Sequence, residues 1–171
     1  MTASLPDPAN ERFLVEVSDT QSHLTIDRAM LSSIVIKTLL DRGILEATIS
    51  LVIVDNGTIH ALNRKHLAHD WPTDVITFPL SDASETRLHG ELVLSAEMAA
   101  TTAYEIGIDP QVELALYLVH GLLHLCGYDD HTEFDQVAMR QAESNALDIA
   151  GFANPFELIE RATGETLPWV G

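Results

Sequence analysis

The stretch His120-Gly-Leu-Leu-His124-Leu-Cys-Gly-Tyr-Asp-Asp-His131 contains three histidines and ends a long apolar segment. Two histidines four residues apart lie on the same face of a helix. Gly127 can end that helix and turn the chain, so that His131 comes back toward the pair. Three neutral imidazoles with one open coordination position form the ligand set of hydrolytic zinc sites. The stretch therefore predicts a metal-binding helix at the centre of the fold, with His120, His124 and His131 as ligands.

The helix that carries the first two histidines is expected to run from Asp109 to Cys126. Asp109-Pro110 is a strong helix start, with an acidic N-cap and a proline in the first turn. The segment is apolar almost all round, which predicts a buried, central helix. Gly121 would let another segment approach closely. Cys126 falls on another face than the histidine pair, so we expect it in the core and not at the metal.

The remaining pattern predicts an α+β fold, in which a small mixed four-stranded sheet packs with about five helices. Strands are expected at Phe13 to Val17, Ala47 to Val54, Val75 to Phe78 and Glu91 to Leu94, and helices at Asp27 to Arg42, Thr58 to His66, Ala96 to Ile106, Asp109 to Cys126 and Thr132 to Ala150. The last helix is expected to turn Phe134, Val137, Ala138, Ala142, Ala146 and Ile149 toward the core.

The length of 171 residues predicts a single domain over 1–171, with loose ends at 1–10 and 164–171. No apolar run reaches the roughly 18 residues that a membrane span needs, and the first residues do not resemble a secretory signal. The single cysteine excludes an internal disulfide. These features together predict a cytoplasmic protein.

The net charge of −17 argues against binding of nucleic acid by bulk electrostatic attraction. The chain has nine lysines and arginines, and their one tight grouping is Arg64-Lys65. If RNA binds, the affinity must come from that basic patch, from the metal or from a docked partner.

The histidines allow three other interpretations. The rings could be ordinary histidines hydrogen-bonded to Asp129 or Asp130, with no metal. A structural zinc is less favoured, because such sites close with four ligands and commonly use cysteine sulfur. A zinc peptidase would place a glutamate directly after the first histidine as its general base. The chain has Gly121 at that position, which counts against proteolysis.

The run from His120 to His131 resembles the signature of the YbeY family of bacterial rRNA maturation endoribonucleases. Two upstream segments are also similar to family motifs. The first combines Leu62-Asn63-Arg64 with the run from Asp70 to Pro79, and the second is Gly90 to Ser95. Downstream, Met139 and Glu143 fit the family's final helix. The resemblance covers roughly residues 45 to 150.

The resemblance implies a zinc-dependent endoribonuclease specific for single-stranded RNA, with one Zn²⁺ per chain. Its expected role is rRNA maturation, at the 3′ end of the small-subunit rRNA, and ribosome quality control. The family also implies association with the small ribosomal subunit, a ribosomal protein and an assembly GTPase. Whether water activated by the ion or the neighbouring 2′-oxygen of the RNA attacks the phosphate stays open. The alternatives are a ribosome-assembly docking protein with a mainly structural metal, and a metallohydrolase of another substrate.

The chain departs from the family pattern at two positions. The family's third histidine commonly stands ten residues after the first, whereas an extra Asp130 puts His131 eleven residues after His120. We still expect His131 as the ligand, with Asp129 or Asp130 orienting a ligand histidine. A family arginine held to be important for activity is replaced by Leu67. Arg64, one helical turn earlier, is the expected substitute for contact with phosphate, and its alternative role is a surface ion pair.

Overall fold

The computed structural model describes residues 12–69, 71, 73–82 and 86–152, so the predicted loose ends at 1–10 and 164–171 lie outside the described residues. Four strands form one sheet in the order β1-β2-β4-β3. Their bounds are Phe13–Asp19 for β1, Glu46–Val54 for β2, Val75–Pro79 for β3 and Arg87–Ser95 for β4. The first three strands of that order are parallel, and β3 is antiparallel to β4 at the edge.

Five helices accompany the sheet in the described part of the chain, and each begins at a side chain that caps it. Their bounds are Arg28–Asp41 for α2, Asn56–Leu67 for α3, Ala96–Ile106 for α4, Pro110–Leu125 for α5 and Glu133–Ile149 for α6. The capping side chains, which accept a hydrogen bond from a backbone N–H of the first turn, belong to Asp27, Asp55, Ser95, Asp109 and Thr132. Such caps stabilise a helix by about 1 kcal/mol each.

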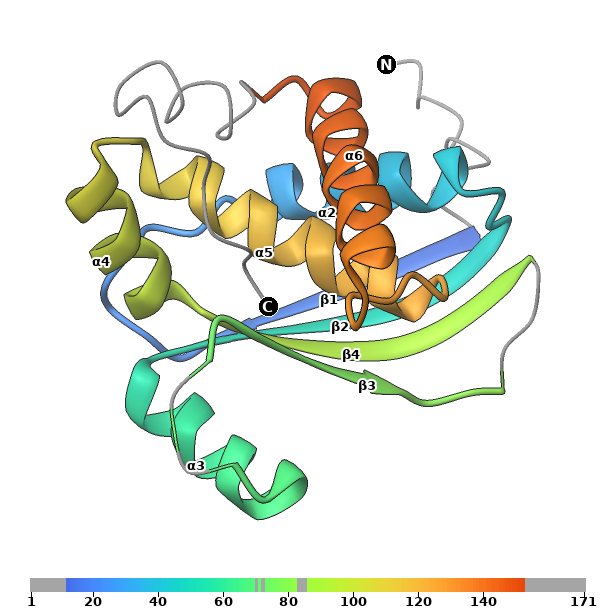
Figure 1. Ribbon diagram of the computed structural model, residues 1–171. Coiled ribbons are helices and arrows are strands. Elements are labelled where there is room, and N and C mark those ends of the chain that lie inside the picture. The colour runs from blue at the N-terminus through green and yellow to red at the C-terminus, as the bar shows by residue number, and fades with distance from the viewer. Residues whose placement is uncertain (1–11, 70, 72, 83–85, 153–171) are drawn as a thin grey trace, which may run out of the picture.

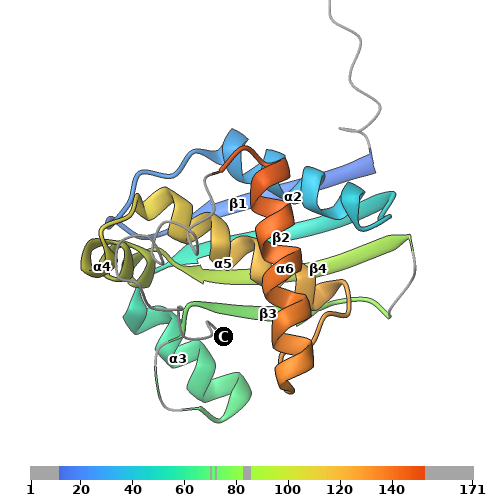
Figure 2. The same cartoon turned by 45° about the horizontal axis from the view of Figure 1, so that its top comes forward.

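The helices cover the two faces of the sheet unequally. Helices α2, α5 and α6 lie over one face, and α3 lies on the other side (Figure 1; Figure 2). The main hydrophobic core lies between the sheet and the helices α2, α5 and α6. It includes the buried side chains of α2, of α5 and of the inward face of β2. A second, smaller cluster joins Ile59 of α3 to Val54, Ile76 and Val93 on the opposite face. The opposite face of the sheet is therefore partly exposed along β1 and β2.

Helix α5 is the buried central element that the sequence predicts, since all residues from Glu113 to Leu123 are buried. Its close approach to the sheet depends on Gly121. A Cβ atom built there would lie 2.4 Å from Leu92 Cδ2 of β4 and 3.1 Å from side-chain carbons of Val75 and Thr77 of β3. Only glycine fits this contact without displacement of its neighbours.

The predicted fold class is confirmed, and the differences are local. Helix α3 begins at Asn56, two residues before the predicted Thr58, and the Asp55 carboxylate caps it by accepting from Thr58 N at 2.8 Å. Strand β4 begins at Arg87, so the polar loop before it is shorter than expected.

The predicted inward face of α6 is wrong in part. Phe134 and Val137 are 82% and 68% exposed, and Ile149 is 45% exposed. The buried face consists of Met139, Ala142, Glu143, Ala146 and Leu147. The apolar spacing does not reveal this face, because the face contains a buried glutamate, Glu143, whose polar partner His120 lies on α5.

Among the described residues, no helix combines the length and the apolar composition needed to cross a lipid bilayer.

Candidate metal centre

A polar stripe runs along one face of the otherwise apolar helix α5. It consists of Glu113, Tyr117, His120 and His124, which follow one another at spacings of four, three and four residues. Glu113, Tyr117 and His120 are buried. Residues three and four apart on a helix are neighbours on its surface, so the stripe is continuous. Its C-terminal end carries the two histidines.

His120 is held by a buried carboxylate of α6. Its Nδ1 lies 2.5 Å from Glu143 Oε1, and the two side chains are only 3% and 2% exposed. Burial alone would lower the pKa of His120, but the hydrogen bond and charge of Glu143 outweigh it and raise that pKa, with help from the charges of Asp74 and Asp130. A hydrogen bond from one ring nitrogen to a carboxylate fixes the orientation and tautomer of a histidine whose other nitrogen binds a metal.

His124 is oriented by the backbone of the turn that follows α5. Its Nδ1 lies 3.0 Å from the carbonyl oxygen of Tyr128. That turn is set by Gly127, whose φ of +98° lies in the left-handed region that favours glycine. The turn is further tied to α2, because Arg42 Nη1 donates to Tyr128 Oη at 2.6 Å.

The other nitrogens of the two rings face each other and a carboxylate. Nε2 of His124 lies 3.0 Å from Nε2 of His120 and 3.2 Å from Asp130 Oδ2. Asp130 Oδ2 is also 3.7 Å from Nε2 of His120. His120, His124 and Asp130 thus bring three ligand atoms within 4.8 Å of one another.

This arrangement fits a cation. A carbonyl and a carboxylate can only accept, so Nδ1 of each neutral ring must donate its proton to them. Each Nε2 then presents a lone pair, and the carboxylate oxygen is a third acceptor. Three acceptors at these distances repel one another unless a positive charge lies between them. His124 and Asp130 are 26% and 19% exposed, so the group can be reached from solvent on their side.

The sequence-predicted third ligand, His131, lies apart from this group. Its side chain is 81% exposed, and its Nε2 pairs with Asp129 Oδ1 at 3.0 Å. His131 forms a second, more exposed group with Asp129 and Asp130. The structure thus brings together His120 and His124 of the predicted residues and adds Asp130.

Asp74, at the residue before β3, contributes negative charge near the centre. It is 8% exposed, and its Oδ1 accepts from Thr73 Oγ1 at 3.1 Å and from Val75 N at 2.8 Å. Its charge contributes to the raised pKa values of His120 and Glu143.

Arg64, the predicted phosphate contact, lies in the last turn of α3 and is exposed. Helix α3 lies on the other side of the sheet from α5 (Figure 1). Leu67, which replaces the family arginine, is 45% exposed in the same turn. Cys126 is half-buried against the core, as predicted, and burial raises the pKa of its thiol to about 11.

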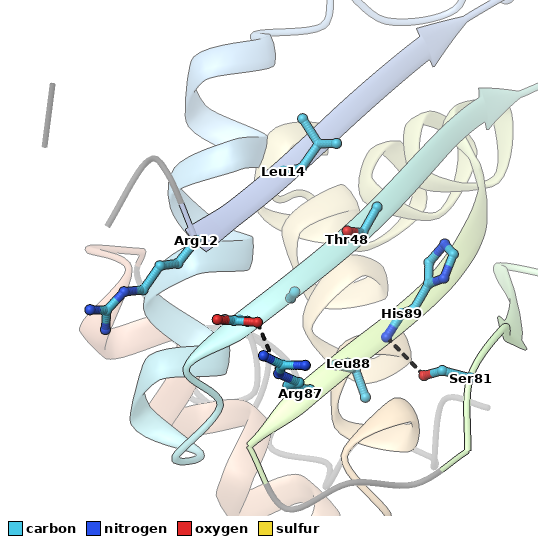
Figure 3. A pocket seen from close by; sticks show the side chains of 9 residues that line it. Arg12, Leu14, Thr48, Ser81, Arg87, Leu88 and His89 are labelled. Carbon is cyan, nitrogen blue, oxygen red and sulfur yellow. Dashed lines mark hydrogen bonds and ion pairs between the residues drawn. The ribbon is translucent and has the colours of Figure 1, made fainter. Parts of the chain in front are cut away.

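A hollow of about 500 Å³ lies on the sheet, and its lining includes none of His120, His124 and Asp130. Leu14 of β1, Thr48 of β2 and His89 of β4 stand side by side on adjacent strands, and Ser81 approaches from the loop before β4 (Figure 3). Its other lining residues are Arg12, Glu46, Ala47, Arg87 and Leu88. Arg87 Nε and Glu46 Oε2 form an ion pair at 2.9 Å.

Two members of the centre were not assigned their roles from the sequence. The sequence places Glu143 on the final helix without a partner, and the structure pairs it with His120. Asp130 was expected to orient a ligand, yet it contributes the third atom of the group. The signal for Asp130 was present in the spacing, because residue 130 stands ten residues after His120.

Comparison with known proteins shows the family of this chain. Residues 15–151 match the model of the family described as Endoribonuclease YbeY. The chain therefore belongs to the YbeY endoribonuclease family. This match confirms the resemblance and the prediction of a family of RNA-cleaving enzymes.

Individual relatives agree with the family match. An Endoribonuclease YbeY from Rhodopirellula baltica is 41% identical over 127 residues, which are 73% of this chain and 63% of that protein. One from Carboxydothermus hydrogenoformans is 36% identical over 81% of this chain and 98% of its own length. The solution structure of a Thermotoga maritima protein shares the fold, with a TM-score of 0.59 and 21% identity over 91% of this chain and 98% of that one.

Proposed function

We propose that this protein is a metal-dependent endoribonuclease that cuts single-stranded RNA and acts in rRNA maturation, at the 3′ end of the small-subunit rRNA. The observation that carries the proposal is the pair of Nε2 atoms of His120 and His124, which face each other at 3.0 Å on the central helix. Names of family relatives support the choice of RNA as the substrate.

We further propose that the ion is Zn²⁺, one per chain, held by His120 and His124 with a third ligand from the turn before α6. When bound, such an ion supplies Lewis acidity toward a non-bridging phosphodiester oxygen. Glu143 and the Tyr128 carbonyl keep both rings in the tautomer that presents Nε2 to the ion. Gly121, which packs against the sheet, leaves no room for the general base of a zinc peptidase at that position.

Two basic surfaces are proposed to bind the RNA backbone in this acidic protein. One is the end of α3 with Arg64 and Lys65, and the other is the hollow with Arg12 and Arg87. Phosphate contacts of this kind make binding salt-dependent, so loss of one contact lowers the salt slope by about one unit. Arg64→Ala and Arg87→Ala are expected to weaken RNA binding in fluorescence anisotropy. Lys37→Ala, which removes an exposed charge of α2, is the control expected to bind RNA like the unchanged protein.

The setting proposed for this activity is the cytoplasm, in a single domain spanning 1–171. The proposed partners are the small ribosomal subunit, one of its proteins and an assembly GTPase, with a role in ribosome quality control. The net charge of −17 supports contact with basic ribosomal proteins, because opposite charges favour and accelerate association.

The same charge supports a second candidate function, a docking protein of ribosome assembly in which the metal is mainly structural. The variant His124→Ala distinguishes the two functions. The control is His23→Ala, because His23 is exposed and distant in sequence from His124. Both variants should keep the far-ultraviolet circular dichroism spectrum of the original protein. If the protein is an enzyme, only His124→Ala should lose cleavage of an unstructured RNA. The unchanged protein should cut this RNA but not a duplex of the same sequence. Full cleavage by a folded His124→Ala variant would favour the docking protein.

A further inference from the structure

We infer that the third protein ligand of the metal centre is Asp130, through Oδ2, and that His131 stays outside the coordination sphere. The centre is then built from two imidazoles and one carboxylate. This inference rests on the proposed presence of a catalytic ion, and it assigns a ligand that differs from the three histidines expected from the sequence.

The first support is the size of the triangle of donor atoms. Its edges are 3.0 Å between the two Nε2 atoms, 3.2 Å from Nε2 of His124 to Asp130 Oδ2, and 3.7 Å from Nε2 of His120 to the same oxygen. Ligand atoms about 2.0–2.1 Å from a tetrahedral ion are about 3.3–3.4 Å apart. The three atoms therefore already have the separation that an ion of this kind requires.

The second support is the way the backbone holds Asp130. The backbone N–H of Asp130 donates to Asp129 Oδ1 at 3.0 Å, and its carbonyl oxygen accepts from Gln136 Nε2 of α6 at 3.1 Å. The side chain is 19% exposed, much less than that of Asp129 at 54%. Asp130 is thus anchored to the start of α6 with its carboxylate turned toward the histidines.

The third support is the position of His131. Its ring is 81% exposed and its Nε2 is paired with Asp129. The next residue, Thr132, already caps α6 by accepting from Asp135 N at 3.0 Å, which fixes the chain on the far side of His131. Bringing the His131 ring to the centre would require displacement of Asp130 and rearrangement of this cap.

A carboxylate ligand changes what the centre binds. It adds one negative charge that a third imidazole would not add, and a hard oxygen donor suits Mn²⁺ and Fe²⁺ better than a third nitrogen does. Zinc also accepts two histidines and one carboxylate in hydrolytic enzymes. The ligand set therefore predicts that the centre binds Zn²⁺. It also predicts a higher affinity for Mn²⁺, relative to that for Zn²⁺, than a centre of three histidines would have.

The test compares Asp130→Asn, His131→Ala and Asp130→His in full-length protein. Zinc and manganese affinities are measured by competition with a chromophoric chelator, and metal content by mass spectrometry. Circular dichroism checks that each variant is folded. We expect Asp130→Asn to lose more zinc affinity than the roughly 10–100-fold that loss of an outer hydrogen-bond partner costs. His131→Ala should bind zinc like the unchanged protein, and Asp130→His should bind zinc but lose affinity for manganese relative to zinc.

Zinc binding that survives in Asp130→Asn, or that is lost in His131→Ala, would overturn the assignment of Asp130. If the ratio of manganese affinity to zinc affinity is the same in Asp130→His as in the unchanged protein, the predicted effect of the carboxylate is wrong. RNA cleavage by the unchanged protein is read separately. If that protein binds zinc through Asp130 but does not cut RNA, the proposed function fails and the ligand assignment stands. If it cuts RNA in a zinc-dependent way while Asp130→Asn still binds zinc, only the ligand assignment fails.

Discussion

Nδ1 of His120 lies 2.5 Å from Oε1 of Glu143, and both side chains are almost fully buried. This contact joins the central helix α5 to the last helix α6 through two polar groups within an apolar core. A buried polar group is costly unless it is hydrogen-bonded, so each residue satisfies the other. The contact also turns Nε2 of His120 toward His124 and Asp130, which links the packing of α6 to the metal centre.

Replacement of Glu143 is expected to weaken metal binding. Glu143→Ala leaves Nδ1 of the buried His120 without this partner, at a cost of about 1–3 kcal/mol in the free energy of unfolding. Loss of such an outer partner lowers metal affinity by roughly 10–100-fold. Glu143→Gln keeps an acceptor oxygen and should show a smaller loss of both quantities. Metal titration and denaturant unfolding measure the two effects, and equal metal affinity in all three proteins would contradict the role of Glu143.

Replacement of Gly121 tests the close packing of α5 on the sheet. Gly121→Ala places a Cβ atom 2.4 Å from Leu92 Cδ2, so neighbouring side chains must move. Overpacking of a core costs about 1–3 kcal/mol. Gly57→Ala is the control, because its Cβ would meet only Asp55 Oδ1 at 3.7 Å and alanine favours a helix. That variant should be more stable by about 0.4–1 kcal/mol in denaturant unfolding. A Gly121→Ala protein as stable as the original would show that the contact is looser than described.

The polar stripe of α5 gives a prediction about pH. Burial raises the pKa of Glu113 above its ordinary value of 4.5, the hydrogen bond with Tyr117 opposes the rise, and the charge of Asp74 adds to it. The folded state then holds the Glu113 proton more tightly than the unfolded state. Its contribution to stability is present below pH 4.5 and is lost as pH rises through the folded pKa.

Glu113→Gln is therefore expected to gain stability relative to the original protein as the pH rises above 4.5 and through the folded pKa of Glu113. Glutamine carries no charge, so its burial does not depend on pH. Urea unfolding at a series of pH values measures the difference between the two proteins. A constant difference across this interval would show that Glu113 titrates alike in the folded and unfolded states.

The sequence predicted the fold well because its local signals agree with the tertiary structure. Asp27, Ser95, Asp109 and Thr132 cap helices where the pattern placed helix starts, and the β-branched run before Val54 forms a central strand. The face of α6 was less predictable. Its inward side contains Glu143, and a pattern of apolar residues cannot show that a carboxylate is paired across helices with His120.

The histidine pair was predictable from four-residue spacing, because both residues lie on one regular helix. The third position was harder to predict because it follows a turn. Gly127 reverses the chain, and the side chain that reaches the centre depends on the backbone between that glycine and Thr132. Residue type favoured His131, whereas the distance from His120 along the chain favoured Asp130. The structure brings the Asp130 carboxylate to the pair.

We propose above that His120 and His124 hold a divalent ion on which RNA cleavage depends. The most direct measurement follows cleavage of an unstructured RNA by three forms of the purified protein: as isolated, after removal of metal by a chelator, and after addition of one equivalent of Zn²⁺. Metal content is determined for each form by mass spectrometry. We expect cleavage to be lost with the metal and to return as the metal content approaches one ion per chain. Undiminished cleavage by folded protein that contains no metal would contradict it.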